Sequence, residues 1–189
     1  MQWHWFRLSA PVRNAGLALA LSALPCASVP AQGVRAPVAE ISLERRAGFG
    51  PGSSYRTEIE GGGLVRFTGL GGRLGGWIDS MRVSPDTVRV LAIEFERADF
   101  FSLDTAYVPG TAGCGSSVTD APTAILTARW RGRIKRVEHY LGCLGPDSVS
   151  SDDSLIERLA HPPGALGRLA ALARRVDAVA PKETHWVRD

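Results

Sequence analysis

The sequence lacks the short motifs that mark most metal, nucleotide and hydrolase sites. It has three cysteines and four histidines in 189 residues, and none form a Cys-x-x-Cys or His-x-x-x-His pair, the spacing typical of zinc ligands. No Gly-x-Ser-x-Gly elbow occurs, so an α/β-hydrolase site is not predicted. The glycine-rich stretch 69–76 leads into the strand-like Trp77-Ile78, not into a helix with Lys-Ser/Thr, so it indicates a β connection, not a phosphate loop.

A calcium loop and a repeat architecture are also missing. Asp152-Asp153 lacks the Asp-x-Asp-x-Asp-Gly order of a calcium loop, and it suits the cap of a short helix at Leu155 better. No internal repeat with a period of 20–50 residues is present. The sequence therefore predicts no metal and no cofactor.

Residues 1–31 contain the three parts of a cleavable secretory signal. Two arginines make the start basic, the run 17–27 is short and apolar, and Val29-Pro30-Ala31 places small residues before a cut. Cleavage there would leave Gln32 as the new N-terminus. We expect this signal to send the chain to the periplasm or outside the cell.

A membrane anchor and a lipid attachment site are the alternatives to a cleaved signal. The run 17–27 is shorter than the ~20 residues that a membrane span requires, and Pro25 and Pro30 interrupt its end. Pro25 also stands before Cys26, whereas a lipid-modified cysteine usually follows a small residue. We therefore prefer the cleaved signal, with no transmembrane span in the mature chain.

The mature chain has nearly balanced charge. The sequence has 22 basic and 19 acidic residues, of which only Arg7 and Arg13 fall in the predicted signal, so 20 basic and 19 acidic residues remain, a net charge of +1. The densest basic stretch, 129–136, would divide its side chains between two faces of a hairpin. Since nucleic-acid binding usually requires a concentrated basic face, no nucleic-acid partner is predicted.

Periodicity predicts the order of secondary structure. Alternating and β-rich runs indicate strands at 41–45, 54–60, 64–69 and about 77–83, and a hairpin from 122–130 and 134–140 that turns at 131–133. Ser84 and Pro85 begin a helix that runs to about Asp99. A short helix at 151–160 and a last helix with an apolar stripe at Leu166, Leu169, Ala173 and Val176 follow.

This order predicts an α+β fold, with a mostly antiparallel sheet built from hairpins and two main helices packed on one face. Removing the signal leaves 189 − 31 = 158 residues, enough for one domain with a substantial core. We assign residues 32–40 to a flexible leader and 41–189 to that single domain.

Cys114 and Cys143 are the two cysteines of the mature chain. An even count in an oxidising compartment favours a disulfide between them. It would close a loop of about 30 residues, which is worth about 3–4 kcal/mol in the chain-entropy treatment. A metal pair would require more ligands, and a nucleophilic cysteine would require a basic partner that the sequence does not identify.

Ser116, Ser117, Asp120 and His139 supply the residue types of a Ser-His-Asp triad in neighbouring elements. A triad is defined by geometry, and simpler roles exist, since Asp120 suits a turn and His139 a packed or exposed strand position. We assign no catalytic residue. A small extracytoplasmic hydrolase that uses these side chains is kept as the alternative function.

The favoured function is a non-catalytic module that binds a protein, a peptide or an envelope component. The candidate interaction residues are Tyr107, Trp77, Trp130, Asp120 and His139. An exposed patch that contains the aromatic members of this set would support a binding role.

Several stretches resemble the bacterial DUF6438 family, a domain of unknown function in exported proteins. The matching segments are Leu43-Glu44-Arg45, Gly48-Phe49-Gly50 with Tyr55 and 56–59, Ser84-Pro85 with 95–103, 118–123, 163–177 and Trp186-Val187. The resemblance implies one α+β domain over most of residues 41–188. It implies no activity and no catalytic residues.

The chain departs from the family pattern at its cysteines. The pattern has a Cys-x-x-x-Cys beside the first strand, where this chain has Gly48 and Gly52. Cys114 and Cys143 instead lie in segments that resemble insertions. The resemblance implies that one disulfide has been replaced by another.

Overall fold

The structure, a computed structural model, describes residues 39–146 and 164–181. The predicted signal at 1–31, most of the leader and the short helix expected at 151–160 lie outside the described residues.

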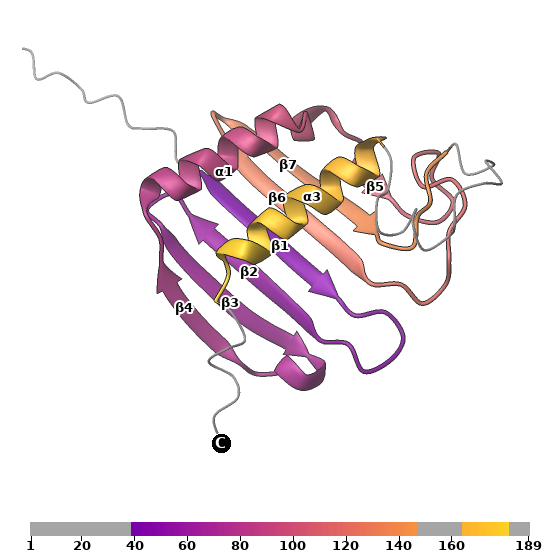
Figure 1. Cartoon of the computed structure of the whole chain (residues 1–189), viewed down its shortest axis with the longest axis horizontal. Coiled ribbons are helices and arrows are strands. Elements are labelled where there is room, and N and C mark those ends of the chain that lie inside the picture. The colour runs from indigo at the N-terminus through magenta and orange to yellow at the C-terminus, as the bar shows by residue number, and fades with distance from the viewer. Residues whose placement is uncertain (1–38, 147–163, 182–189) are drawn as a thin grey trace, which may run out of the picture. The chain divides into compact units, whose positions relative to one another are not determined.

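Seven strands form a single mixed sheet (Figure 1). They are β1 (Glu40–Arg46), β2 (Ser54–Glu60), β3 (Leu64–Gly71), β4 (Ile78–Arg82), β5 (Ala106–Tyr107), β6 (Thr123–Trp130) and β7 (Arg133–Tyr140). Their order across the sheet is β4-β3-β2-β1-β6-β7-β5, and every neighbouring pair is antiparallel except β5 and β7. The prediction of a mostly antiparallel sheet is confirmed.

The hairpins form where glycine permits the tight turns that join the strands. In the turn between β6 and β7, Arg131 has φ 50° and Gly132 has φ 77°. Two consecutive left-handed residues make the turn whose twist matches that of the flanking strands. Trp130 pairs with Arg133 directly across this turn, so the turn fixes the register of the longest hairpin.

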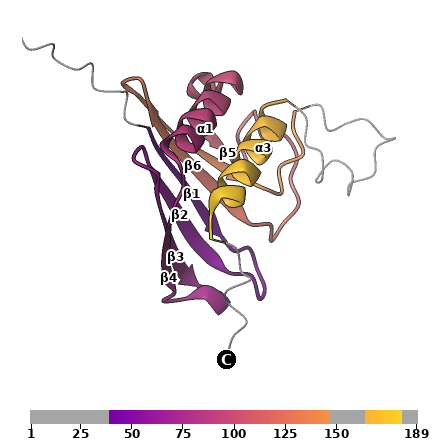
Figure 2. The same cartoon turned by 60° about the vertical axis from the view of Figure 1, so that its left-hand side comes forward.

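Two helices, α1 (Pro85–Arg97) and α3 (Gly164–Val179), cover one face of the sheet (Figure 2). α1 begins as predicted, because the Ser84 Oγ accepts a hydrogen bond from the Thr87 backbone N–H at 3.1 Å and Pro85 occupies the first turn. The α+β class is therefore confirmed. No helix within the described residues combines the length and the apolar character that a bilayer span requires.

The core lies between these helices and the inner face of the sheet. Strand alternation turns one set of side chains toward the helices, where Phe95 and Phe100 meet edge to face at 4.8 Å between ring centroids. The largest buried side chains are contributed by five strands, both helices and the 3₁₀ turn Phe100–Ser102: Ile41, Leu43, Ile59, Val65, Leu126, Val137, Val88, Phe95, Phe100, Leu166, Leu169 and Val176. The sheet and the helical elements thus contribute equally to this set, six side chains each.

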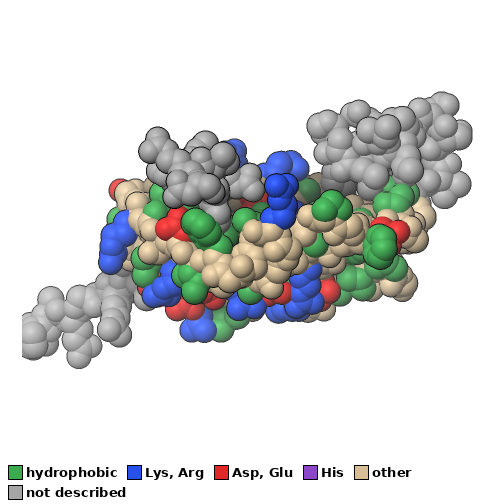
Figure 3. Space-filling view, turned by 90° about the horizontal axis from the view of Figure 1, so that it is seen from below, with side chains coloured by type: hydrophobic (Ala, Val, Ile, Leu, Met, Phe, Trp, Pro, Cys, Tyr) green, Lys and Arg blue, Asp and Glu red, His purple; other side chains and the backbone are tan. Residues whose placement is uncertain are grey.

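The outer face of the sheet carries charged side chains in opposite-sign pairs. On this face Arg129 contacts Glu40 at 3.1 Å and Arg56 contacts Glu44 at 2.6 Å. Near the turn of the β6–β7 hairpin, Arg131 and Arg133 both contact Glu96 of α1, at 3.3 and 2.6 Å. Figure 3 shows one side of the molecule, on which basic and acidic side chains are intermixed. The basic residues of this hairpin therefore do not form a face of one sign.

Candidate functional site

A disulfide joins the two loops at one end of the sheet. Cys114 and Cys143 are bonded, with their Cα atoms 4.8 Å apart, and both side chains are buried. Backbone hydrogen bonds extend the connection, including Gly145 N–H to the Cys114 carbonyl at 2.9 Å and Val118 N–H to the Gly142 carbonyl at 2.9 Å. The bonded sulfurs are unavailable as metal ligands or as a nucleophile.

The residues of the hypothetical triad occupy different environments. Ser116, Ser117 and Asp120 are exposed on the disulfide-linked loop, whereas His139 is buried on β7. Asp120 has φ 62°, the left-handed conformation that aspartate adopts in turns, as predicted for this position. Among the described residues, no hydrogen bond joins His139 to Asp120 or to either serine, and a general base needs such contacts. The geometry gives the hydrolase hypothesis no support.

His139 instead behaves as a neutral core histidine. Its side chain is 2% exposed, and its Nδ1 atom has no hydrogen-bond partner among the described residues. Burial, with a smaller contribution from the positive charge of Arg45, lowers its pKa from 6.5 to about 4. It lies beside Tyr107 of β5 and Ala124 of β6 in the sheet.

A polar cluster ties the last turns of α3 to the sheet. The Asp177 carboxylate accepts hydrogen bonds from Arg45 Nη2 of β1 and from the Tyr55 hydroxyl of β2, both at 2.8 Å. Burial, followed by the neighbouring Asp177 charge, raises the pKa of Tyr55, which therefore remains a neutral donor. All three groups are engaged with one another, so the cluster fixes the position of α3 over β1 and β2.

Two of the three aromatic residues proposed for interaction are buried. Tyr107 is 5% exposed and Trp130 is 4% exposed. Both side chains belong to the helix-facing core, so neither can form the exposed patch expected in a binding site. Trp77, which immediately precedes β4, is 42% exposed and is the aromatic of this set that reaches the surface.

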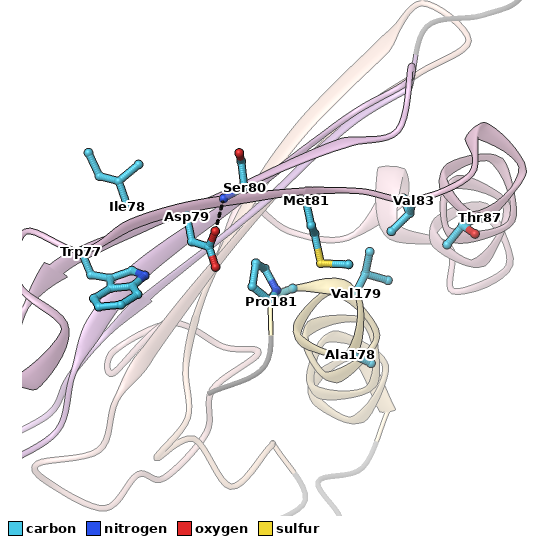
Figure 4. A pocket seen from close by; sticks show the side chains of 11 residues that line it. Trp77, Ile78, Asp79, Ser80, Met81, Val83, Thr87, Ala178, Val179 and Pro181 are labelled. Atoms are coloured by element: carbon cyan, nitrogen blue, oxygen red, sulfur yellow. Dashed lines mark hydrogen bonds between the residues drawn. The ribbon is translucent and has the colours of Figure 1, made fainter. Parts of the chain in front are cut away.

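A groove lies between β4 and the end of α3 (Figure 4). It has a volume of about 820 Å³, within the range of ligand-binding clefts. Its described lining is Trp77, Ile78, Asp79, Ser80, Met81, Val83 and Thr87 on one side and Ala178, Val179, Ala180 and Pro181 on the other. Figure 4 shows Met81 and Trp77 on the α3 side of β4 and Ile78 on the opposite side.

The groove exists because α1 and α3 cover the centre of the sheet and leave its β4 edge open. Val65 and Phe67 of β3 pair with Met81 and Asp79 of β4, so these side chains share the inner face. The β3 members are buried, yet Met81 is 39% exposed and the outward Ile78 is 76% exposed. Sequence reasoning identified Trp77 but missed Ile78 and Met81, whose exposure depends on the position of the helices.

Among the strands that the structure describes, β4 is an edge strand with one unpaired side. Gly69 N–H donates to the Trp77 carbonyl at 2.7 Å, and Val83 N–H donates to the Gly63 carbonyl at 2.9 Å. Because bonded and non-bonded pairs alternate in an antiparallel ladder, the backbone groups of residues 78, 80 and 82 face away from β3. Asp79 Oδ1 accepts from the Ser80 N–H at 2.7 Å and so covers one of these edge donors.

Asp120 lines a second, smaller cleft beside the hairpin that joins β1 and β2. This cleft has a volume of about 340 Å³ and also contacts Arg45, Tyr55 and the 91%-exposed Phe49. Arg45 and Tyr55 already bind Asp177, so the polar groups there are committed to the fold. Among residues 39–146 and 164–181, no group of three or more His, Cys, Asp or Glu side chains could hold a metal ion.

These features define the class of protein as a helix-backed antiparallel α+β domain with a crosslinked loop pair and an open sheet edge. The family model of DUF6438, described as a domain of unknown function, matches residues 39–160, which is more than half of the chain. The chain belongs to the DUF6438 family, as the resemblance implied. A comparison with curated proteins found no match.

Proposed function

We propose that this protein is an exported, non-catalytic binding domain that takes an extended polypeptide along the free edge of β4. In this proposal residues 1–31 are a cleaved signal, 32–40 a leader, and 41–189 the binding domain of the periplasm or the extracellular space. The disulfide between Cys114 and Cys143 supports such a compartment. Isolation of the chain from inside the cell with residues 1–31 attached and both thiols reduced would contradict export.

The open β4 edge is the observation that carries the binding function. Edge strands with exposed apolar side chains invite pairing with another chain, and soluble domains usually shield them. Here Trp77, Ile78 and Met81 remain 39–76% exposed on or beside such a strand. The groove places apolar surface directly next to free backbone donors and acceptors, the combination that strand addition uses for affinity and specificity.

The partner predicted by this chemistry is an extended peptide with alternating apolar side chains. Its backbone would pair with residues 78, 80 and 82, and every second side chain would enter the groove beside Met81. Asp79 is the charged residue among those that line the groove, so a basic residue next to the apolar ones would be favoured. Paired charges on the outer face provide no comparable site for a nucleic acid.

Selection from a library of displayed eight-residue peptides tests this function. Peptides recovered on the wild-type protein should lose about tenfold or more in affinity for Met81→Arg, because the new charge enters the groove. Ile134→Arg is the matched control, since it adds the same charge in place of a 61%-exposed isoleucine on β7, which lies away from β4 in the sheet. Equal binding by both variants, or no selected peptide, would refute the proposed site.

A further inference from the structure

We infer that, when no peptide is bound, β4 pairs with β4 of a second copy of this chain, antiparallel and centred on Ser80. The inference rests on the proposed function for the use of this edge, and it names the competitor that a peptide must displace. Among the described strands β4 stands at one end of the sheet, and four of its five side chains are exposed. An exposed edge of this kind is a template for a like edge.

A two-fold axis through Ser80 allows all five residues of β4 to pair. Ile78 then lies opposite Arg82 of the second copy, and the two Ser80 residues face each other. Asp79 lies opposite Met81 of the second copy. The backbone groups of residues 78, 80 and 82 point away from β3, so three opposite pairs exchange hydrogen bonds in both directions. Any shift along the edge leaves part of the strand unpaired.

The charges on β4 favour the same register. Asp79 and Arg82 are the charged residues of the strand, and with the axis at Ser80 each of them faces an uncharged side chain. An axis at residue 79 would bring the two Asp79 carboxylates opposite each other, and an axis at residue 82 would do the same to the two arginines. Like charges directly opposite destabilise a strand pair. The axis at Ser80 therefore combines the longest overlap with no like-charged opposite pair.

This pairing covers apolar surface that the helices leave open. The axis is perpendicular to the sheet, so both copies keep their helices on the same side and their two grooves meet. Met81, which is 39% exposed, gains the strand of the second copy as a neighbour on the groove side. On the other side Ile78, which is 76% exposed, packs against the aliphatic part of Arg82 of the second copy. Both contacts remove apolar surface from water.

Asp79 keeps the self-pairing weak enough for a peptide to displace it. Its Oδ1 atom accepts a hydrogen bond from the Ser80 N–H at 2.7 Å, and the second copy must break this contact to use that N–H. The second copy also offers Met81 opposite Asp79, and this side chain carries no compensating charge. A peptide with Lys or Arg at that position adds a charge-assisted contact that the self-pair lacks. The apparent affinity for a peptide should therefore fall as the protein concentration rises.

Single cysteines on the outer face of β4 test the pairing and its register. In the chain with its native disulfide intact, Ser80→Cys should form a bridge between two copies on air oxidation, because the two Cα atoms at residue 80 lie about 5.5 Å apart. Ile78→Cys and Arg82→Cys are matched controls on the same face of the same strand. Each lies about 13 Å from its own counterpart, four residues along the strand, and should give about one-tenth of that yield or less.

A mixture of the two control proteins provides the positive counterpart. Residue 78 faces residue 82 of the second copy, so Ile78→Cys and Arg82→Cys should bridge to each other when mixed, although neither bridges to itself. Equal yields from the three single variants would indicate random collision and overturn the inference. No bridge from Ser80→Cys, or no bridge in the mixture, would overturn it as well.

A synthetic peptide separates this inference from the proposed function. The peptide WIDSMRV, residues 77–83, reproduces the edge of the second copy. At a concentration that fills about 90% of the edges it should reduce the Ser80→Cys bridge about tenfold, whereas a scrambled peptide should not; an unreduced bridge would overturn the inference. Library peptides that bind a protein forming no bridge would keep the proposed function and refute self-pairing. A bridge at residue 80 with no library peptide recovered would keep self-pairing and refute the peptide-binding function.

Discussion

Lowering the pH from 7 to 5 is predicted to destabilise the fold through one side chain, His139. Burial, and secondarily the Arg45 charge, lowers the pKa of this imidazole to about 4 in the folded protein. In the unfolded chain the pKa returns to about 6.5. As the pH falls below 6.5, the unfolded chain takes up the proton first, so protonation favours unfolding.

The size of the effect follows from the difference between the two pKa values. Each pKa unit corresponds to 1.36 kcal/mol, so a fall from 6.5 to about 4 sets a maximum of about 3 kcal/mol. Between pH 7 and pH 5 the linkage relation gives a loss of about 2 kcal/mol. Below pH 4 both states carry the proton and His139 contributes no further change. Stability from this residue is thus complete above pH 6.5 and is lost as the pH falls through the 6.5–4 window.

Urea denaturation of wild type and His139→Leu at pH 7, 6 and 5 measures this contribution. Leucine has a similar volume and removes the Nδ1 atom that lacks a partner among the described residues, so the variant should stay within about 1 kcal/mol of wild type at pH 7. Between pH 7 and pH 5, the free energy of unfolding of wild type should then fall by about 2 kcal/mol more than that of the variant. Carboxylates titrate alike in both proteins and cancel. Parallel pH profiles would refute the assignment of His139 as a buried neutral histidine.

Three further perturbations test the packing. Reduction of the Cys114–Cys143 bond should lower the free energy of unfolding by about 3–4 kcal/mol, measured by urea titration with and without reductant. Asp177→Ala removes the acceptor of two 2.8 Å hydrogen bonds and should lower the free energy of unfolding by about 1–2 kcal/mol, discounted for partial exposure. An unchanged denaturation midpoint would contradict a stabilising role for the polar cluster. Gly48→Ala should cost about 1–3 kcal/mol, because its Cβ would lie 2.0 Å from a backbone oxygen. Gly62→Ala is the control, because a Cβ added at Gly62 meets nothing within 4 Å, and its free energy of unfolding should stay within about 0.5 kcal/mol of wild type. Equal melting temperatures for the two variants would show that the contact at Gly48 relaxes without cost.

The sequence was sufficient to predict most of the sheet. Alternation located β2 at its observed bounds, 54–60, because hairpin strands with one buried face have a strict period of two. The Ser84-Pro85 start of α1 was equally local, since a cap depends on neighbouring backbone groups. The two-residue strand β5 (Ala106–Tyr107) was not predicted. Two residues carry no periodic signal, and the parallel pairing with β7 is a long-range contact.

The candidate site could not be predicted in the same way, because exposure depends on where the helices cross the sheet. Strand alternation places Trp130 on the same face as Ala124, and that face is the core. Trp77 precedes a strand of similar composition but lies at the uncovered edge, and it is 42% exposed. Periodicity distinguishes the two faces of a strand, whereas strand order and helix placement decide which face is reached by solvent.

The family resemblance implies that one disulfide has replaced another, and a contact between two loops bears on this hypothesis. In the family resemblance, cysteines occupy the positions of Gly48 and Gly52, in the hairpin between β1 and β2. In this chain the carbonyl oxygen of Asp120 lies 2.0 Å from where a Cβ at Gly48 would stand, so the neighbouring loop fills the space that a cysteine requires. That same loop is held by the bond between Cys114 and Cys143. A crosslink over a five-residue loop is worth about 2 kcal/mol in the chain-entropy treatment, against about 3–4 kcal/mol for one that spans about 30 residues. The Cys114–Cys143 crosslink therefore stabilises the fold more than a crosslink between positions 48 and 52 would. It also holds the loop that contacts Gly48.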